Sequence, residues 1–322
     1  MKNLRSIVFF GTHELAVPAL DSLVELDLTP ELVVTRPRVG LAAAEDGADS
    51  AEIENPVRAW SQERGVEVVR SRRAAEPALA ERIAALKPDL LLVVDYGRAL
   101  PVELLDAAPR GAIEVQPSLL PKLRGEHAVR AALAGGEKKT GVTVFQLNEE
   151  PWGGPVLFQQ ELEVGTDETF AELLPRVREL AGELLEKALK KLDRSKGKPK
   201  GKPQNAKIAT RVPQIGGRHR RAPWALKAAR VYNRLRAYSP PGLLAYNKYR
   251  PLVILAGKSL EWVEAPYGTT GTYIGLRGGR LAVLCGDSTV FGIERLRRPD
   301  GEVTSASTFA RDEELRVGDR FI

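Results

Sequence analysis

The stretch GAIEVQPSLLPKLRG, from Gly111 to Gly125, decides the fold of this chain. Its residues Ala112 to Gln116 have the composition of a short buried strand, and the proline that follows ends it. Ser118 to Pro121 then predicts a stiff turn that leads to a basic tip at Lys122 and Arg124. Open α/β sheets place their ligand sites where such strands end in polar loops, so we expect the functional site here.

The first 192 residues alternate short apolar runs with segments of helical periodicity. Strands are expected at residues 4–10, 31–35, 66–69, 90–94, 112–116, 141–147 and 156–164, and helices at residues 14–26, 55–64, 76–86, 127–133 and 168–192. Asn55 is the expected N-cap of the second helix and Pro56 its first residue. Apolar strands alternating with helices predict an α/β fold, with a parallel-rich, doubly wound, Rossmann-like sheet.

The composition changes after residue 192. Residues 194–207, RSKGKPKGKPQNAK, combine Lys, Gly and Pro without an apolar period, which predicts a flexible cationic tether. Beyond a helix at 223–237, strands at 252–255, 271–276, 280–284 and 289–295, followed by a helix at 305–311, are typical of a small OB-like β-barrel. We therefore expect a domain at 1–192, a basic linker at 193–222 and an OB-like domain at 223–322.

The charges are distributed unevenly. Residues 1–190 carry 22 Lys and Arg against 31 Asp and Glu, whereas residues 191–322 carry 26 against 11. A basic half joined to an acidic half favours a polyanionic partner, with a solvated basic surface as the alternative. The single cysteine, Cys285, excludes a disulfide framework and a thiolate metal site, so we expect a cytoplasmic protein without metal. The first apolar run, Ser6 to Phe10, is too short for a signal peptide or membrane span, and no membrane partner is expected.

Several segments resemble methionyl-tRNA formyltransferases in collinear order. They are IVFFGTHELAVPAL at 7–20, LLLVVDYGRALP at 90–101, SLLPKLRG at 118–125, TGVTVFQL at 140–147, LRAYSPPG at 235–242 and VGDRFI at 317–322. The resemblance implies a formyltransferase domain followed by an OB-like RNA-binding domain. It also implies a role in translation initiation, through transfer of a formyl group from 10-formyltetrahydrofolate to the amine of methionyl-tRNA.

That reaction needs a hydrogen-bond donor at the formyl oxygen, a proton shuttle near the amine and a carboxylate that orients the shuttle. The resemblance assigns these tasks to an Asn, a His and an Asp, and this sequence has Glu114, Gln116 and Trp152 at the matching positions. An ionised Glu114 only accepts hydrogen bonds, Gln116 cannot shuttle a proton, and Trp152 should fill the cavity. The three replacements predict a catalytically inactive relative, a pseudoenzyme.

The neighbourhood of these positions offers two possible surrogates, Glu126 and His127, although a His beside a Glu is usually a surface pair. We expect His13 to cap a helix or face solvent. The resemblance also assigns the folate-side walls, which we interpret as structural here, so no cofactor is expected unless an active enzyme uses 10-formyltetrahydrofolate. These wall residues are Tyr96, Gly97, Arg98, Leu100, Ser118, Leu119, Leu120 and Pro121.

Basic residues of the linker and second domain are expected to contact the phosphates of tRNA or another RNA. They are Lys196, Lys198, Lys200, Lys202, Arg218, Arg220, Arg221, Arg234 and Arg236. Four interleaved tyrosines are candidates for stacking on bases, although packing is the commoner fate of Tyr. They are Tyr232, Tyr238, Tyr246 and Tyr249. The loop after the second strand is basic in the family, but here residues 39–57 carry five carboxylates and no Lys or Arg, which should repel a phosphate backbone.

Three functions are consistent with these patterns. The favoured one is an inactive methionyl-tRNA formyltransferase homologue that binds RNA or another partner through its basic half. The second is a working formyltransferase, on methionyl-tRNA or another amine, with an altered site that uses His127, Glu114 or Glu126. The third is a scaffold protein that binds neither folate nor RNA. The sequence itself names no protein partner.

Overall fold

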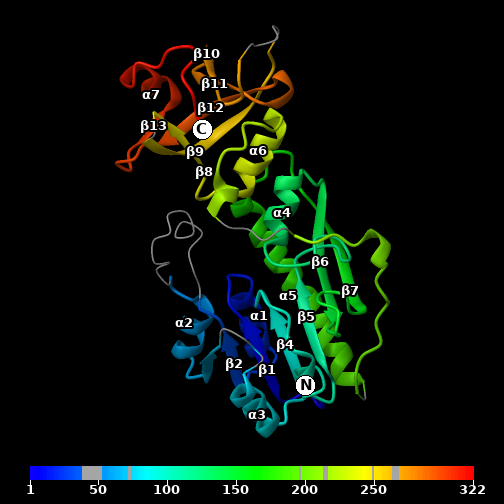
Figure 1. The fold of residues 1–322 in the computed structure, drawn as a ribbon. Helices are drawn as coiled ribbons and strands as arrows, with labels where there is room; N and C mark the ends of the chain where they lie inside the picture. The colour runs from blue at the N-terminus through cyan, green and yellow to red at the C-terminus, as the bar shows by residue number, and fades with distance from the viewer. Residues whose placement is uncertain are drawn as a thin grey trace. The chain divides into compact units, whose positions relative to one another are not determined.

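The structure, a computed structural model, describes residues 1–37, 53–71, 74, 76–195, 197–212, 217–248, 250–262 and 268–322 (Figure 1). The chain forms two compact units. The first unit comprises residues 1–128, 139–163 and 174–214. The second unit comprises residues 129–138, 164–173 and 215–322. Each unit is built around a sheet of its own, so we treat them one after the other.

The first unit contains a seven-stranded sheet in the order β3-β2-β1-β4-β5-β6-β7. Strands β1 to β5 pair in parallel, and β6 and β7 add antiparallel strands at one edge. The predicted parallel-rich, doubly wound sheet is therefore confirmed, with its strand order reversing between β1 and β4. The strands are β1 Ile7–Gly11, β2 Leu32–Thr35, β3 Val68–Arg70, β4 Leu90–Val94, β5 Ala112–Gln116, β6 Lys139–Gln146 and β7 Val156–Glu163.

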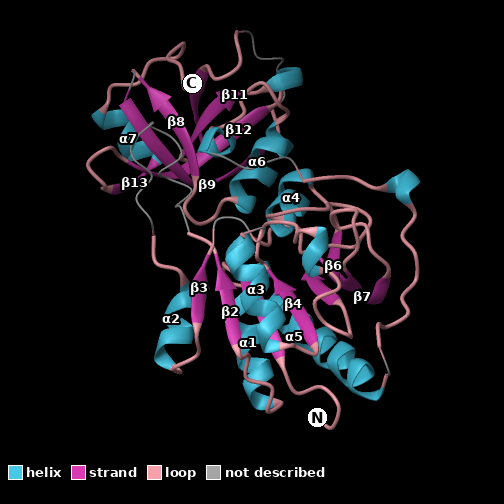
Figure 2. Cartoon of the chain, turned by 60° about the horizontal axis from the view of Figure 1, so that its bottom comes forward, coloured by secondary structure: helices cyan, strands magenta, loops and turns pink. Residues whose placement is uncertain are grey.

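Helices flank this sheet, as Figure 2 shows. They are α1 Ala16–Glu25, α2 Pro56–Glu63, α3 Pro77–Leu86 and α5 Phe170–Arg194, with a 3-10 turn η1 at Val102–Leu104. The Asn55 side chain accepts hydrogen bonds from the backbone N–H groups of Val57 and Arg58, both at 3.1 Å, which confirms the predicted N-cap. Its amide also donates to Thr35, so the cap anchors α2 to the end of β2. Among the described helices, none has the length and apolar composition needed to cross a membrane.

The second unit contains an antiparallel sheet in the order β10-β11-β12-β9-β8, with β13 paired to β12. Its strands are β8 Leu243–Asn247, β9 Arg250–Leu260, β10 Tyr273–Arg277, β11 Arg280–Leu284, β12 Val290–Arg297 and β13 Val303–Ser305. Near the C-terminus, Phe321 bridges to Asn247 and Arg320 bridges to Thr272. The last residues therefore join the two ends of the strand order, which closes the sheet into the expected barrel.

Two segments that were expected in the first domain, residues 129–138 and 164–173, pack within this second unit, against helix α6, Ala228–Ala237. Arg230 donates to the carbonyl of Gly135, in helix α4, at 2.6 Å. Tyr232 donates to the carboxylate of Asp167 at 2.6 Å. The remaining elements are α4 Ala128–Gly135, α7 Ala306–Asp312, and the 3-10 turns η2 Ala206–Ile208, η3 Gly217–Arg220 and η4 Gly286–Ser288. Side-chain contacts on α6 thus hold residues 129–138 and 164–173 in the second unit.

The basic linker is docked on the first unit over residues 197–212. The backbone N–H of Val156 donates to the Lys202 carbonyl at 2.7 Å, and that of Lys202 donates to the Val156 carbonyl at 2.8 Å. The Gln204 side-chain amide donates to the carbonyls of Trp152 and Gly154, at 2.9 and 2.7 Å. The prediction of a flexible tether is wrong for this segment, because main-chain hydrogen bonds hold it without an apolar face.

Candidate functional site

The first and third replaced positions bond to each other. Trp152 Nε1 donates to Glu114 Oε1 at 2.9 Å, which joins the loop between β6 and β7 to strand β5. Glu114 is buried, with 8% of its surface exposed. Trp152 has a backbone φ of 57°, a left-handed conformation that bulky residues rarely adopt. The indole is therefore held against β5 by its own hydrogen bond and by the Gln204 bond to its carbonyl.

The surroundings of the Glu114 carboxyl group favour its neutral form. Burial raises its pKa to about 8 because it penalises the ionised form, while the Trp152 hydrogen bond opposes the rise and the Asp95 charge adds to it. The raised pKa runs against the expectation of an ionised Glu114 that only accepts hydrogen bonds. A neutral carboxyl has one donor of its own, and the oxygen bonded to Trp152 serves as an acceptor.

Gln116 braces the loop that follows β5. Its amide donates to the carbonyls of Leu123 and Gly125, at 3.3 and 2.9 Å, and only 3% of the residue is exposed. Arg124, expected at an exposed basic tip, is also buried, where its guanidinium donates to Glu150 and Gln204. Gln116, at the position of the family's proton shuttle, thus stabilises the conformation of the loop over residues 117–125.

Half of the predicted folate walls are core residues. Tyr96, Leu100, Ser118 and Leu120 are buried. The Tyr96 ring packs edge-on against Phe10 at 5.4 Å between centroids. The turn is tied to β6, since Thr143 Oγ1 donates to the Ser118 carbonyl at 2.6 Å and accepts from the Leu120 N–H at 3.2 Å. Of the other wall residues, Arg98 is exposed, and Gly97, Leu119 and Pro121 are half-buried.

Glu126, one of the two possible surrogates, forms an ion pair with Arg36 at 2.9 Å. This pair lies directly over Gly97, because a Cβ added to that glycine would stand 1.9 Å from Glu126 Oε1 and 2.5 Å from Arg36 Nη2. Gly97 also has a φ of 77°. The glycine is therefore required by the packing of the ion pair, and the Glu126 carboxylate is engaged with the Arg36 cation.

A histidine–aspartate pair that was not predicted from the sequence lies at the carboxyl ends of β1 and β4. His13 Nδ1 lies 3.2 Å from the Asp95 carbonyl and 3.6 Å from its carboxylate, and the His13 ring lies 6.0 Å from that of His127. The His13 side chain is 19% exposed, so it is mostly enclosed and its ring is engaged with Asp95. The available signal was that each residue lies just after a predicted strand, the strands at residues 4–10 and 90–94.

The electrostatics of this pair favour its charged form. Burial lowers the pKa of His13, but the hydrogen bond and charge of Asp95 outweigh that effect and leave the pKa raised. Burial likewise raises the pKa of Asp95, yet the hydrogen bond and charge of His13 leave it lowered. Asp95 thus orients the imidazole through Nδ1, which leaves Nε2 as the nitrogen that faces away from the carboxylate.

The basic residues expected to bind RNA fall into two groups. Arg220 and Arg236 are buried, and their guanidiniums donate to backbone carbonyls, those of Gly242, Gly165 and Glu168. The exposed side chains are those of Lys198, Lys200, Lys202 and Arg221, and Arg234 is half-buried. The RNA-binding prediction therefore concentrates on the second group.

Parts of the predicted RNA site lie outside the described residues. They are Lys196, Tyr249, the side chain of Arg218, and the acidic loop over residues 38–52. Of the other tyrosines, Tyr238 is buried, Tyr232 is bonded to Asp167, and Tyr246 lies under the Arg221 guanidinium at 5.5 Å from its ring centre.

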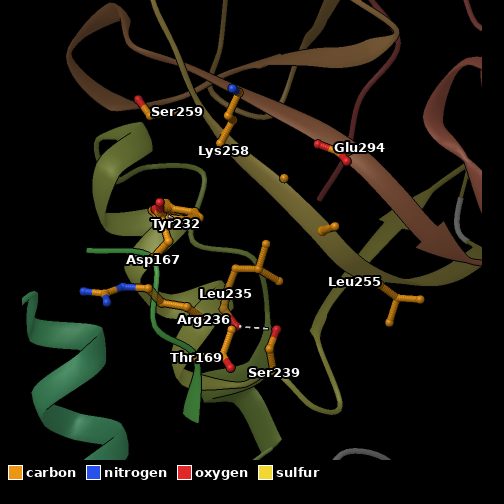
Figure 3. A pocket seen from close by; sticks show the side chains of 12 residues that line it. Asp167, Thr169, Tyr232, Leu235, Arg236, Ser239, Leu255, Lys258, Ser259 and Glu294 are labelled. Atoms are coloured by element: carbon orange, nitrogen blue, oxygen red, sulfur yellow. Dashed lines mark hydrogen bonds between the residues drawn. The ribbon is translucent and has the colours of Figure 1, made fainter. Parts of the chain in front are cut away.

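Figure 3 shows a groove in the second unit, lined by α6, β9 and residues 167–169. Its volume is about 500 Å³. Ser239 Oγ donates to the Leu235 carbonyl at its base, at 3.0 Å. The lining brings the carboxylates of Asp167 and Glu294 together with Lys258. Because its charges are mixed, this groove is poorly suited to a polyanion.

Comparisons with known proteins fit this architecture. The family model described as Formyl transferase matches residues 4–189, and the model described as Formyl transferase, C-terminal domain matches residues 217–314. The chain belongs to the formyl transferase family. It is similar to the methionyl-tRNA formyltransferase of Anaeromyxobacter sp. (strain K), at 36% identity over 97% of this chain and 99% of that protein. It is also similar to that of Geobacillus thermodenitrificans, at 32% identity over 96% and 94% of the two chains. The protein is therefore methionyl-tRNA formyltransferase-like.

Solved structures share the fold at lower identity. The N-formyltransferase from Helicobacter canadensis, in complex with folinic acid and dTDP-3-aminofucose, has a TM-score of 0.62 at 14% identity, over 90% of this chain and 98% of that one. HypX from Aquifex aeolicus, in complex with tetrahydrofolic acid, has a TM-score of 0.58 at 18% identity. The present chain aligns over 98% of its length but spans 48% of HypX.

Proposed function

We propose that this methionyl-tRNA formyltransferase-like protein has lost the family's formyl transfer and binds tRNA or another RNA through its basic second half. The observation that carries the proposal is the hydrogen bond between Trp152 and Glu114. This bond engages Glu114, which stands at the position of the expected oxyanion donor. Its other partner, the Trp152 indole, stands at the position of the expected carboxylate. Gln116, at the position of the proton shuttle, is bonded to the backbone and has no group that titrates near neutral pH.

The residues present do not fit 10-formyltetrahydrofolate at this centre. Tyr96 and Leu100, two of the expected walls, belong to the hydrophobic core, and the Arg36–Glu126 pair packs over Gly97. Trp152, in the loop between β6 and β7, stands at the position where the resemblance places the family's carboxylate. These features support a structural role for the retained walls, and we expect no folate-dependent step here.

RNA binding is supported by the charge distribution and by the relatives' names. Proteins at 32–36% identity over nearly the whole chain are named for methionyl-tRNA. Residues 191–322 carry 26 Lys and Arg against 11 Asp and Glu. Exposed lysines along the linker can neutralise phosphates and release their counterions, which is the main source of affinity for nucleic acids. The cytoplasm, where tRNA is charged, is the expected location.

The test is a formyl-transfer assay at high protein concentration with 10-formyltetrahydrofolate and methionyl-tRNA, run beside tRNA titrations at 50 and 200 mM salt. Loss of one oxyanion donor lowers turnover about 10²–10³-fold, and loss of a whole constellation leaves little beyond binding. We therefore expect no formylation above background, and tRNA binding that weakens at least about tenfold between the two salt concentrations. Trp152→Phe, which keeps a ring but removes the donor, should be equally inert.

Two results would overturn the proposal. Formylation by the wild-type protein would show an altered but working site, and substitutions of Glu114, His13 and Asp95 would then identify it. Absence of tRNA binding even at 50 mM salt would remove the RNA-binding part and favour the scaffold alternative. The combined variant Glu114→Asn, Gln116→His and Trp152→Asp measures how far the loss extends: a gain of activity would confine it to these three positions.

A further inference from the structure

A second groove lies entirely within the first unit, between β7 and the docked linker. Its volume is about 590 Å³, within the range that holds a nucleotide-sized ligand. Its lining comprises Leu120, Pro121, Val156, Leu157, Phe158, Gln159, Lys191, Lys200, Gly201, Lys202, Pro203, Gln204 and Asn205. Among these described residues there are three lysines and no carboxylate, which distinguishes this linker groove from the mixed-charge groove of the second unit.

The lining of the linker groove includes an aromatic ring, that of Phe158. The Phe158 ring is half-buried, and the Lys191 ammonium lies 5.3 Å from its centre. Lys191 also donates to the carbonyl of Lys200 at 3.3 Å, which places its charge between the ring and the linker. An aromatic ring beside ammonium groups is the arrangement with which proteins hold single-stranded nucleic acid, by stacking a base and neutralising its phosphate.

The groove has a fixed shape because the linker approaches β7 closely. Lys202 and Val156 exchange both of their backbone hydrogen bonds. A Cβ added to Gly201 would stand 2.8 Å from the Val156 carbonyl oxygen and 2.9 Å from the Pro155 backbone, so a side chain there would push the linker off the strand. The exchanged bonds also close the edge of β7 at Val156, which disfavours an added peptide strand.

We propose that the linker groove binds a segment of single-stranded RNA, with a base stacked on Phe158 and phosphates at Lys191, Lys200 and Lys202. This inference deepens the proposed function and rests on it for the class of partner. It assigns to residues 200–205 a shaped binding surface in place of a non-specific cationic tail. Sequence preference is expected to be weak, because stacking and phosphate contacts read no base edges.

The experiment measures binding of a fluorescent eight-nucleotide single-stranded RNA to the full chain at several salt concentrations. Lys200→Gln with Lys202→Gln should reduce the slope of log K against log salt by about 1.4, since each phosphate contact to a single strand contributes about 0.7. Phe158→Ala should weaken binding about tenfold or more while it leaves the slope unchanged. Gly201→Val keeps every charge but removes the docked linker, and should weaken binding to the same degree.

The matched control is Lys187→Gln with Lys190→Gln, which removes two exposed lysines of α5 outside the groove. It should bind RNA like the wild type. The inference is overturned if Phe158→Ala and Gly201→Val bind normally, or if a poly-glutamate peptide displaces the RNA at equal concentration of charges, because either result indicates charge alone. Binding of tRNA but not of the short RNA would overturn the groove and leave the proposed function. Binding of the short RNA but not of tRNA would support the groove and remove tRNA, but not RNA, from the proposed function.

Discussion

Each replaced position has acquired a partner of its own. The Glu114 carboxyl group accepts from Trp152, and Gln116 donates to two carbonyls of the loop that it begins. A buried polar group without a partner costs about 1–3 kcal/mol, so these bonds explain how the fold accommodates these side chains at the three positions. The same reasoning applies to His13 and Asp95, which form a pair at the ends of neighbouring strands.

The protonation of Glu114 makes stability depend on pH. Burial raises its pKa in the folded protein to about 8, above the value of 4.5 for an exposed glutamate. The folded state therefore binds more protons than the unfolded state, and stability falls as pH rises through this window. Glu114→Gln stays neutral and keeps the acceptor for Trp152. Relative to wild type, we expect it to be more stable by roughly 2–4 kcal/mol at pH 8.5 and about equal at pH 4.5.

Urea unfolding of both proteins at the two pH values measures this difference. Glu149→Gln, an exposed change in the Trp152 loop, is the control and should follow the wild type at both pH values. An equal effect of Glu114→Gln at pH 4.5 and 8.5 would mean that Glu114 is ionised in the folded protein.

At the scale of elements, the hydrophobic pattern of the sequence predicted where several strands begin and end, but not which segments contact one another. Strands β4 and β5 were predicted at their observed bounds, because each is a five-residue apolar-rich run that a polar residue or a proline ends. Strands β8 and β13 were not predicted as strands, since β8 directly follows the Pro-Pro-Gly sequence and β13 has three residues. Docking of the linker could not be predicted, because it depends on main-chain hydrogen bonds that composition does not encode.

The linker itself yields a prediction. Gln204 ties it to the Trp152 loop through two hydrogen bonds, each worth about 1 kcal/mol. Gln204→Ala should therefore speed amide hydrogen exchange of residues 197–212 about 10- to 30-fold and leave β4 and β5 unchanged. Lys207→Ala, an exposed change in the same segment, should have no such effect. If exchange in the linker is already fast in the wild type, the segment is not docked in solution.

At the scale of the whole molecule, the sequence predicted two folded parts but not how the chain divides between them. Residues 129–138 and 164–173 lie within the first expected domain, yet the contacts place them in the second unit. The reason lies in side chains such as Arg236, whose guanidinium donates to the carbonyls of Gly165 and Glu168. Such long-range bonds have no signature in a periodicity of 2 or 3.6 residues. The same holds for the candidate site. The resemblance identified Glu114, Gln116 and Trp152 as its positions, but it did not predict the hydrogen bonds that these residues form.

This division predicts how the molecule loses structure. Phe321 is fully buried where the C-terminus closes the barrel, so Phe321→Ala should destabilise the second unit by about 3–5 kcal/mol. Hydrogen exchange should then accelerate together in residues 215–322, 129–138 and 164–173, and stay unchanged in β1, β4 and β5. Ile322→Ala, at a position 56% exposed, is the neighbouring control and should change little. If residues 129–138 and 164–173 keep their wild-type protection in Phe321→Ala, they belong energetically to the first unit, and the boundary expected at residue 192 stands.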